Sequence, residues 1–285
     1  MALSIELMLK VLSFFVYKTI LSQVYDNIKF MKISIIMVCL NAQNVIEKTL
    51  KSIFEQTYKN TELIIFDGKS SDGTVDIIEK YMDNVSFFHS GEDKGLYDAM
   101  NCALKRVTGD WILFFNAGDT FCDDYVLEKT AAEISKNPDC SFVFGYSKDV
   151  DENGNCVKIN TYDNFDRNYF FLNENICHQA IFYEKKLFLN DCYDIKNFKI
   201  YADWDFNARC IKIKKVKMHR MDFAVCNFDI TGISRNMKYL EIFDREKDLI
   251  WRKYFPLIYK FSKIDRFMLK TFKSIYLPLR KLFIK

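Results

Sequence analysis

The alternation of hydrophobic runs with amphipathic stretches between residues 32 and 119 constrains the fold more than any other feature of this sequence. Apolar runs at Ile33–Cys39, Leu63–Phe66, Val85–His89 and Trp111–Phe115 predict four strands. Between these runs, apolar residues recur at helical spacing. Because this order is typical of parallel strands joined by helices, we expect an α/β fold with a mostly parallel sheet flanked by helices.

The chain beyond Asp119 alternates less regularly. Further elements are expected there in this order: a helix over 124–135, a strand over 141–147, a hairpin turn at 152–155, a loop over 161–176, a strand after Ala180, a helix from Tyr201, a strand over 216–228 and a helix after Ser234. With 285 residues, 49% of them hydrophobic, the chain can fill one large core. We therefore expect a single compact domain over residues 31–250.

Residues 1–30 are expected to form an amphipathic extension ahead of this domain. Their uncharged stretch, Val11–Tyr17, is too short to span a bilayer, and no small-residue cleavage site follows it. An interfacial helix and a simple upstream extension both fit this pattern. The nine cysteines form no CxxC pair, which favours reduced thiols in the cytosol.

Residues 251–285 form a basic tail with ten Lys and Arg residues against one Asp, whereas the whole chain has a net charge of only +3. Apolar residues recur there at helical spacing, which predicts a basic amphipathic helix that lies on an anionic membrane. A helix packed on the domain with solvated charges is the alternative. Because the rest of the chain is net acidic, we expect no nucleic-acid partner. We expect a cytoplasmic protein, peripherally bound to the inner face of the cell membrane.

Acidic residues follow three of the first four predicted strands: Asp67, Asp93 and Asp119. The carboxyl ends of parallel strands share one edge of the sheet, and ligands of open α/β sheets bind at that edge. The sequence has neither a G-x-G-x-x-G motif after its first strand nor a G-x-x-x-x-G-K-[ST] motif. A nucleotide at this edge is therefore expected to be held by carboxylates and a metal ion.

The turn Asn116-Ala117-Gly118-Asp119 directly follows the fourth predicted strand. Asp119 offers a carboxylate oxygen and Asn116 a carbonyl oxygen, and such ligands suit Mg²⁺ or Mn²⁺ holding a diphosphate. Taken alone, the segment also fits a surface turn that caps the next helix, because Asn, Gly and Asp are common turn formers.

Five segments between Lys32 and Gly232 form a wider pattern: ISIIMVCLNAQNVIEKTLKSIFEQTYKNTELIIFDGKSSDGT, DKGLYDAMN, TGDWILFFNAGD, CHQA and ADWD. Together they resemble the inverting glycosyltransferases of family 2, which have the Rossmann-like, nucleotide-sugar-binding GT-A fold. The resemblance is greatest to members that build bacterial surface polysaccharides. It implies transfer of a sugar from a nucleotide-sugar donor, expected to be a UDP-sugar, to a hydroxyl of a lipid-linked saccharide acceptor, with Mg²⁺ or Mn²⁺ as cofactor.

The resemblance assigns roles to residues at the start of the pattern and in the fourth-strand turn. Leu40 and Asn41 match the loop near the nucleoside, and Asp67 matches the aspartate that hydrogen-bonds the base. Asp119 matches the metal-binding carboxylate of the family's DxD element. Asn116 stands where the first aspartate is usual, so one carboxylate is left, with the amide and the diphosphate supplying further oxygens.

The remaining donor contacts are also implied by the resemblance. Asp93, Lys94 and Asn101 match the segment beside the ribose and phosphates, where Lys94 balances phosphate charge. His178 and Gln179 match a CHQ motif that borders the reaction centre, as sugar or phosphate contacts. A structural role is the alternative for His178, since a lone histidine before an apolar strand is usually a satisfied structural residue.

Inversion at a sugar carbon needs a base that takes the proton of the attacking hydroxyl. Asp203 matches the catalytic aspartate of the family, and Asp205 is its competitor two residues later. The alternative for Asp203 is a helix cap. Gly232 and Ser234 resemble a late loop that closes over the diphosphate.

Two other functions are weighed against a transferase. A nucleotidyltransferase is disfavoured because the glycine-rich, basic loop usual after its first strand is missing. A catalytically degenerate scaffold that binds membrane and partner enzymes is kept open by the single carboxylate of the Asn116–Asp119 turn.

Overall fold

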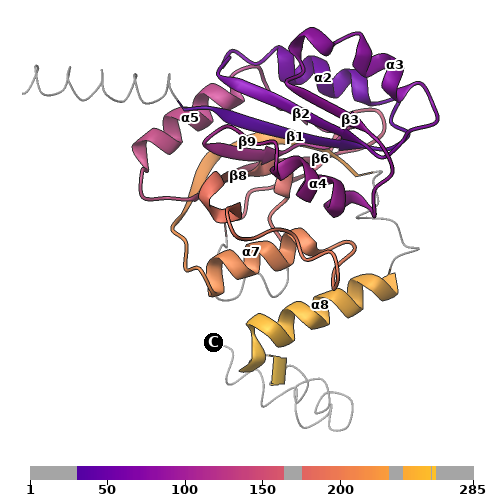
Figure 1. Cartoon of the computed structure of the whole chain (residues 1–285). Coiled ribbons are helices and arrows are strands. Elements are labelled where there is room, and N and C mark those ends of the chain that lie inside the picture. The colour runs from indigo at the N-terminus through magenta and orange to yellow at the C-terminus, as the bar shows by residue number, and fades with distance from the viewer. Residues whose placement is uncertain (1–30, 164–174, 231–239, 258, 261–285) are drawn as a thin grey trace, which may run out of the picture.

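The computed structural model describes residues 31–163, 175–230, 240–257, 259 and 260 (Figure 1). Within these residues one sheet has nine strands in the order β3-β2-β1-β4-β8-β6-β9-β5, and β7 pairs with β6. The strands are β1 (Ile33–Cys39), β2 (Thr61–Asp67), β3 (Phe87–Ser90), β4 (Trp111–Phe114), β5 (Thr120–Phe121), β6 (Phe142–Val150), β7 (Cys156–Asn160), β8 (Ile181–Glu184) and β9 (Met218–Asp229).

Helices cover both faces of the sheet (Figure 1). The α-helices are α2 (Ile46–Phe54), α3 (Thr74–Glu79), α4 (Leu96–Leu104), α5 (Val126–Lys136), α7 (Ala202–Lys212) and α8 (Leu240–Tyr254), and the 3₁₀ helices are η1 (Met82–Asn84), η2 (His178–Ala180) and η3 (Lys185–Phe188). Helices α2, α3 and α5 pack into one core cluster, and α4, α7 and α8 pack into the other.

The two faces follow from the period of the strands. In β1, Ile33, Ile35 and Met37 belong to the cluster with α2, whereas Ile36 and Val38 belong to the cluster with α4. Successive side chains of a strand point to opposite faces, so a strand with apolar residues on both faces must be covered twice. This explains why β1 is apolar on both faces, with Ser34 as its one polar residue.

The expected α/β class with flanking helices is confirmed. Strands β1 to β4 pair in parallel, as their spacing predicted. Beyond them the sheet is mixed: β8 runs antiparallel to β4 and β6, β7 and β5 are antiparallel to their partners, and β6 and β9 are parallel. The turn expected at residues 152–155 joins β6 to β7, and so short a connection permits only antiparallel pairing.

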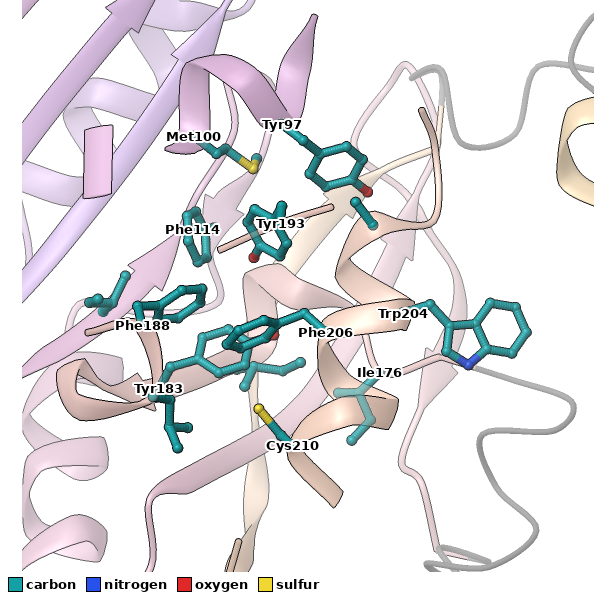
Figure 2. Packing of buried hydrophobic residues seen from close by; sticks show 14 of the residues in the cluster. Tyr97, Met100, Phe114, Ile176, Tyr183, Phe188, Tyr193, Trp204, Phe206 and Cys210 are labelled. Carbon is teal, nitrogen blue, oxygen red and sulfur yellow. The ribbon is translucent and has the colours of Figure 1, made fainter. Parts of the chain in front are cut away.

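An aromatic cluster fills the space between α7 and the sheet (Figure 2). Phe188 and Phe206 stack with their ring centroids 4.2 Å apart, and Tyr193 packs edge-on to both. Phe114 of β4 packs against Phe188 and Tyr193. Such ring contacts add roughly 0.5–1.5 kcal/mol per pair to the burial of apolar area, so α7 is held firmly to the end of β4.

The start of the basic tail belongs to this core. Tyr254 and Phe255 are buried in the same cluster as α7, so the packed chain continues beyond the expected domain end at residue 250. None of the described helices combines the length and the apolarity needed to cross a bilayer. The expectations for residues 1–30, for residues 261–285 and for Gly232 and Ser234 lie outside the described residues.

A buried carboxylate holds the opposite, amino-terminal edge of the sheet together. Glu62 of β2 accepts hydrogen bonds from the Ser34 hydroxyl, from the N–H and hydroxyl of Thr108 and from the N–H of Gly109. Lys32 Nζ lies 2.8 Å from its Oε2. Burial acts to raise the pKa of Glu62, but the hydrogen bonds from Lys32, Ser34 and Thr108 outweigh burial and hold the pKa at about 2.

We expect Glu62→Gln to lower the free energy of unfolding by about 1–3 kcal/mol near neutral pH, because the amide places N–H₂ where several donors need an acceptor. The folded-state pKa lies below the ordinary value of 4.5, so the wild-type advantage is present above pH 4.5 and is lost as the pH falls towards about 2. Urea unfolding of both proteins across this range measures the difference. A difference independent of pH would contradict the assignment.

Candidate active site

The carboxyl end of β4 meets the beginnings of β8 and α7. Because β8 runs antiparallel beside β4, the residues before β8 lie at the edge where β4 ends. Five residues expected in the site come together there: Asn116, Asp119, His178, Gln179 and Asp203. They are connected by hydrogen bonds, although the chain separates the first from the last by almost ninety positions.

Asp119 is a buried carboxylate with only 3% of its surface exposed. Its Oδ2 accepts a hydrogen bond of 2.8 Å from Gln179 Nε2, and its Oδ1 accepts one of 2.9 Å from the N–H of Asp229. Burial raises the pKa of Asp119 to about 7, and these hydrogen bonds offset the effect only in part. A nearby positive charge would stabilise the ionised form.

Asn116 supplies the unpaired oxygen of the site. Its Nδ2 lies 3.3 Å from His178 Nε2, whereas its Oδ1 is buried and has no hydrogen-bond partner within the described residues. An unpartnered buried oxygen is costly unless a ligand pairs with it. With Asp119 in the same turn, this oxygen fits a hard divalent cation such as Mg²⁺ or Mn²⁺.

His178 joins Asn116 to Asp203. Its Nδ1 lies 3.3 Å from Asp203 Oδ2, and its Nε2 faces the Asn116 amide nitrogen. The neutral tautomer with the proton on Nδ1 satisfies both contacts, since Nδ1–H donates to the carboxylate and Nε2 accepts from the amide. This arrangement turns the carbonyl oxygen of Asn116 away from the imidazole and leaves it available.

Asp203 lies in the first turn of α7 and is buried, with 7% of its surface exposed. In addition to His178, its Oδ2 accepts a hydrogen bond of 2.7 Å from Asn175 Nδ2, and its Oδ1 lies 2.8 Å from the Tyr97 hydroxyl. Three partners on different segments therefore fix the direction of this carboxylate, as is needed for a group that takes a proton from a bound substrate.

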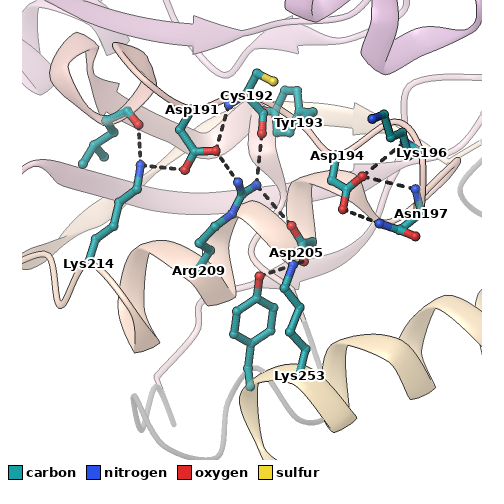
Figure 3. Close-up of polar contacts among 12 residues, drawn as sticks. Asp191, Cys192, Tyr193, Asp194, Lys196, Asn197, Asp205, Arg209, Lys214 and Lys253 are labelled. Atoms are coloured by element: carbon teal, nitrogen blue, oxygen red, sulfur yellow. Dashed lines mark hydrogen bonds and ion pairs between the residues drawn. The ribbon is translucent and has the colours of Figure 1, made fainter.

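Asp205 belongs to a different network (Figure 3). It is fully buried and accepts hydrogen bonds from Arg209, Lys253 and Tyr254. These donors lie on α7 itself and on α8, away from the Asp119 turn. The geometry therefore favours Asp203 over Asp205 as the group that faces the site.

The loops after β1 and β2 are tied together beside Asp67. This carboxylate accepts hydrogen bonds from the N–H and hydroxyl of Ser70 and from the Ser90 hydroxyl, and it is buried. The Asn41 N–H donates to the Ser70 hydroxyl, while Leu40 is exposed. The structure thus places Leu40, Asn41 and Asp67 together, and their contacts with a nucleoside stay a prediction.

The residues expected beside the ribose and phosphates have different surroundings. Lys94 is exposed at the start of α4, and the neighbouring Asp93 Oδ1 accepts a hydrogen bond of 2.7 Å from the Gly95 N–H. The carboxamide of Asn101 makes two hydrogen bonds with the backbone of Tyr193, so it secures the loop beneath α4. Contacts of these residues with a nucleotide-sugar also stay a prediction.

A family model described as Glycosyl transferase family 2 matches residues 34–193, more than half of the chain. The chain belongs to glycosyl transferase family 2. The PGL/p-HBAD biosynthesis glycosyltransferase of Mycobacterium tuberculosis is 34% identical over 203 residues, which cover 70% of this transferase and 77% of that relative. The UDP-Glc:alpha-D-GlcNAc-diphosphoundecaprenol beta-1,3-glucosyltransferase WfaP of Escherichia coli is 41% identical over 88 residues, 30% of this chain and 35% of that relative.

Solved structures show the same fold. S. aureus TarS 1–349 in complex with UDP-GlcNAc has a TM-score of 0.59 at 18% identity, with 85% of the transferase and 76% of that chain covered. The mannosyltransferase PcManGT of Pyrobaculum calidifontis in complex with GDP-Man and Mn2+ has a TM-score of 0.51 at 16% identity, with coverage of 82% and 64%. The transferase spans 46% of a longer S. aureus TarS chain. The GT-A fold expected from the sequence is confirmed.

Three residues of the site were missed in the sequence. Tyr97 lies inside the DKGLYDAMN segment but carries no signal that separates it from core aromatics. Asn175 precedes the CHQA segment. Asp229 donates its backbone N–H to Asp119, and its nearby carboxylate helps to raise the pKa of Asp119. Pairing across the sheet and packing of α4 on α7, which a single sequence does not specify, place them here.

We expect Tyr97→Phe to lower turnover of the transferase by about fivefold, since one hydrogen bond to the Asp203 carboxylate, worth about 1 kcal/mol, is lost while the ring volume is kept. Tyr58→Phe is the matched control, because Tyr58 is also buried but its hydroxyl bonds the Met31 carbonyl far from the site. Turnover per folded protein should fall only in the first variant. Equal effects of the two changes would contradict a role of Tyr97 in the site.

Proposed function

We propose that this family 2 transferase is an inverting enzyme that moves a sugar from a nucleotide-sugar donor, a UDP-sugar, to a hydroxyl of a lipid-linked glycan. The single observation that carries the proposal is the hydrogen-bonded chain from Asn116 through His178 to Asp203. This chain links the Asn116 Oδ1, an oxygen unpaired within the described residues that could bind a metal ion, with the buried Asp203 carboxylate, whose orientation is fixed by its hydrogen bonds. A sugar held between them would have its leaving group on one side and a base on the other.

The donor class is supported by the names of related proteins. The relative WfaP is named for a UDP-Glc donor, and a structural neighbour is in complex with UDP-GlcNAc. We infer that Asp67 accepts from a uracil N–H, with Leu40 and Asn41 beside it. Asp93 and Lys94 lie just before the first residue of α4, where Lys94 would balance phosphate charge.

Mg²⁺ or Mn²⁺ fits the oxygen atoms of the Asn116–Asp119 turn. No three His, Cys, Asp or Glu side chains gather as a metal cluster in the part of the chain that the structure describes. Asp119, the Oδ1 of Asn116 and oxygens of the donor diphosphate would therefore share the coordination. When bound, the cation would neutralise charge on the departing diphosphate.

Asp203 is proposed as the base. The acceptor oxygen forms a bond to the anomeric carbon as the bond from that carbon to the diphosphate oxygen breaks, and the hydroxyl proton passes to the Asp203 carboxylate. Hydrogen bonds from His178, Asn175 and Tyr97 keep this carboxylate in one orientation. Attack from the face opposite the leaving group inverts the configuration of the sugar.

The acceptor and the membrane belong to the same proposal. The relative WfaP is named for a diphosphoundecaprenol-linked acceptor, a lipid-borne saccharide. An enzyme that uses such a substrate works at a bilayer surface, and the basic amphipathic sequence of residues 251–285 fits peripheral binding to the cytoplasmic membrane. A degenerate scaffold, favoured only by the single carboxylate of the metal turn, is the second candidate.

We expect the protein to bind UDP and a UDP-sugar in the presence of Mn²⁺ and to lose this binding with chelator or in Asp119→Asn. Asn keeps the size of the side chain, and Gln179 can turn its amide to meet it, so the variant should fold. Calorimetric titration with UDP, GDP and their sugars checks the prediction. Metal-dependent binding with release of UDP supports the transferase, and absence of binding to any of them favours the scaffold.

We expect removal of residues 261–285, which contain seven Lys and Arg residues, to abolish binding to phosphatidylglycerol vesicles while nucleotide binding is kept. The cut spares Tyr254 and Phe255, which are part of the core. Co-sedimentation with vesicles of phosphatidylglycerol or of phosphatidylcholine alone measures the effect. Replacing Lys270, Lys273 and Lys281 by Gln is the matched control for charge. A truncated protein that still sediments with anionic vesicles would show that the tail is not the anchor.

A further inference from the structure

Helix α8 holds the chain segment that leads into α7. Glu246 of α8 is fully buried and accepts hydrogen bonds from three successive backbone N–H groups, those of Lys199, Ile200 and Tyr201, at 2.7, 3.0 and 2.9 Å. The side chain of Tyr201, the N-cap residue of α7, makes no capping hydrogen bond. The carboxylate of another helix therefore satisfies the backbone at this point, and α7 starts where Glu246 fixes it.

The far end of α8 grips the first turns of α7 by a second contact (Figure 3). Lys253 Nζ and the Tyr254 hydroxyl lie 2.9 and 2.8 Å from Asp205 Oδ1, and Arg209 lies 3.1 Å from Asp205 Oδ2. Removing one of these partners would leave the buried Asp205 carboxylate incompletely paired, which destabilises the folded state. Glu246 and Tyr254 are eight residues apart, about two helical turns, so one face of α8 makes both contacts.

Both contacts lie next to Asp203. The segment held by Glu246 ends two residues before it, and Asp205 follows it by two residues. The partners of Asp203 on the other side belong to different segments: His178 precedes β8, and Tyr97 lies on α4, where its hydroxyl also lies 2.6 Å from the Ile200 carbonyl oxygen. The position of Asp203 relative to the sheet is therefore set by α4 and η2 on one side and by α8 on the other.

We propose that α8 acts in the reaction by positioning Asp203, with Glu246 and Tyr254 as positioning residues that touch neither donor nor acceptor. The inference rests on the proposed role of Asp203 as base. A displacement of a reacting group by about 1 Å can slow a reaction about a hundredfold, so small movements of the first turn of α7 matter. Nucleotide binding should not depend on α8, because Asp67 is the last residue of β2 and Asn116 and Asp119 lie in the turn that follows β4.

The test uses the full chain with Glu246→Gln and Tyr254→Phe, each alone and in an Asp203→Asn background. Turnover is measured as UDP release from UDP-glucose and UDP-N-acetylglucosamine, and donor affinity is measured by calorimetry. In Glu246→Gln an amide nitrogen replaces one acceptor oxygen, and in Tyr254→Phe only a hydroxyl is removed. Glu62→Gln is the control, since Glu62 is also a buried, multiply bonded carboxylate and lies at the opposite edge of the sheet.

We expect Glu246→Gln to lower kcat by about tenfold, with the donor dissociation constant changed by less than about twofold, and Tyr254→Phe to lower kcat to a smaller extent. Neither change should reduce kcat further when residue 203 is Asn, because the group being positioned is then absent. Glu62→Gln should leave kcat per folded protein unchanged. If Glu246→Gln does not fold, Tyr254→Phe makes the same test.

Wild-type kcat in the folded variants, or losses that multiply with that of Asp203→Asn, would overturn the inference while leaving Asp203 as the base. Full turnover in Asp203→Asn itself would instead remove the base assignment, and with it the proposed mechanism. The two failures are thus distinguished within one set of proteins.

Discussion

The antiparallel pairing of β8 with β4 is the constraint on which the site depends. In this register Leu113 is opposite Phe182, and extending it past the two strands leads to Asn116 and Gln179. Residues that follow β4 therefore lie opposite residues that precede β8. Parallel pairing at this position would have put the CHQ segment at the far edge of the sheet, and neither His178 nor Gln179 could have reached the Asn116–Asp119 turn.

This arrangement holds polar groups in an apolar setting. The turn that bears Asn116 and Asp119 lies between Phe115 and Phe121, whose rings stack with centroids 4.3 Å apart and close the loop at its base. The same apolar surroundings raise the pKa of Asp119 to about 7 and leave the Asn116 oxygen without a partner among the described residues. Buried polar groups that destabilise the folded chain in the absence of a ligand are typical of functional sites. A bound cation would stabilise both the Asp119 carboxylate and the Asn116 oxygen.

The sequence predicted the parts of the fold that depend on local period. Strand Ile33–Cys39 was expected at its observed bounds, and the acidic residues at strand ends were placed at one edge by topology alone. The sequence could not decide the direction of the side chains, because Asp203 and Asp205 are both aspartates and are two residues apart in one helix. Their difference appears only when α8 and the β8 segment are in place. Tyr97 was missed for the same reason, because its partner lies about a hundred residues away.

The separation of Asp203 and Asp205 follows from helix geometry. Residues i and i+2 of an α-helix are related by a rotation of about 200°, so the carboxylates of Asp203 and Asp205 point in nearly opposite directions. One faces the end of β4 and meets His178, and the other faces α8 and meets Lys253 and Tyr254. The first turn of α7 therefore joins the proposed reaction centre to α8. Because α8 holds the first turn of α7 through Glu246, Lys253 and Tyr254, this helix contributes to the geometry of the proposed base, Asp203.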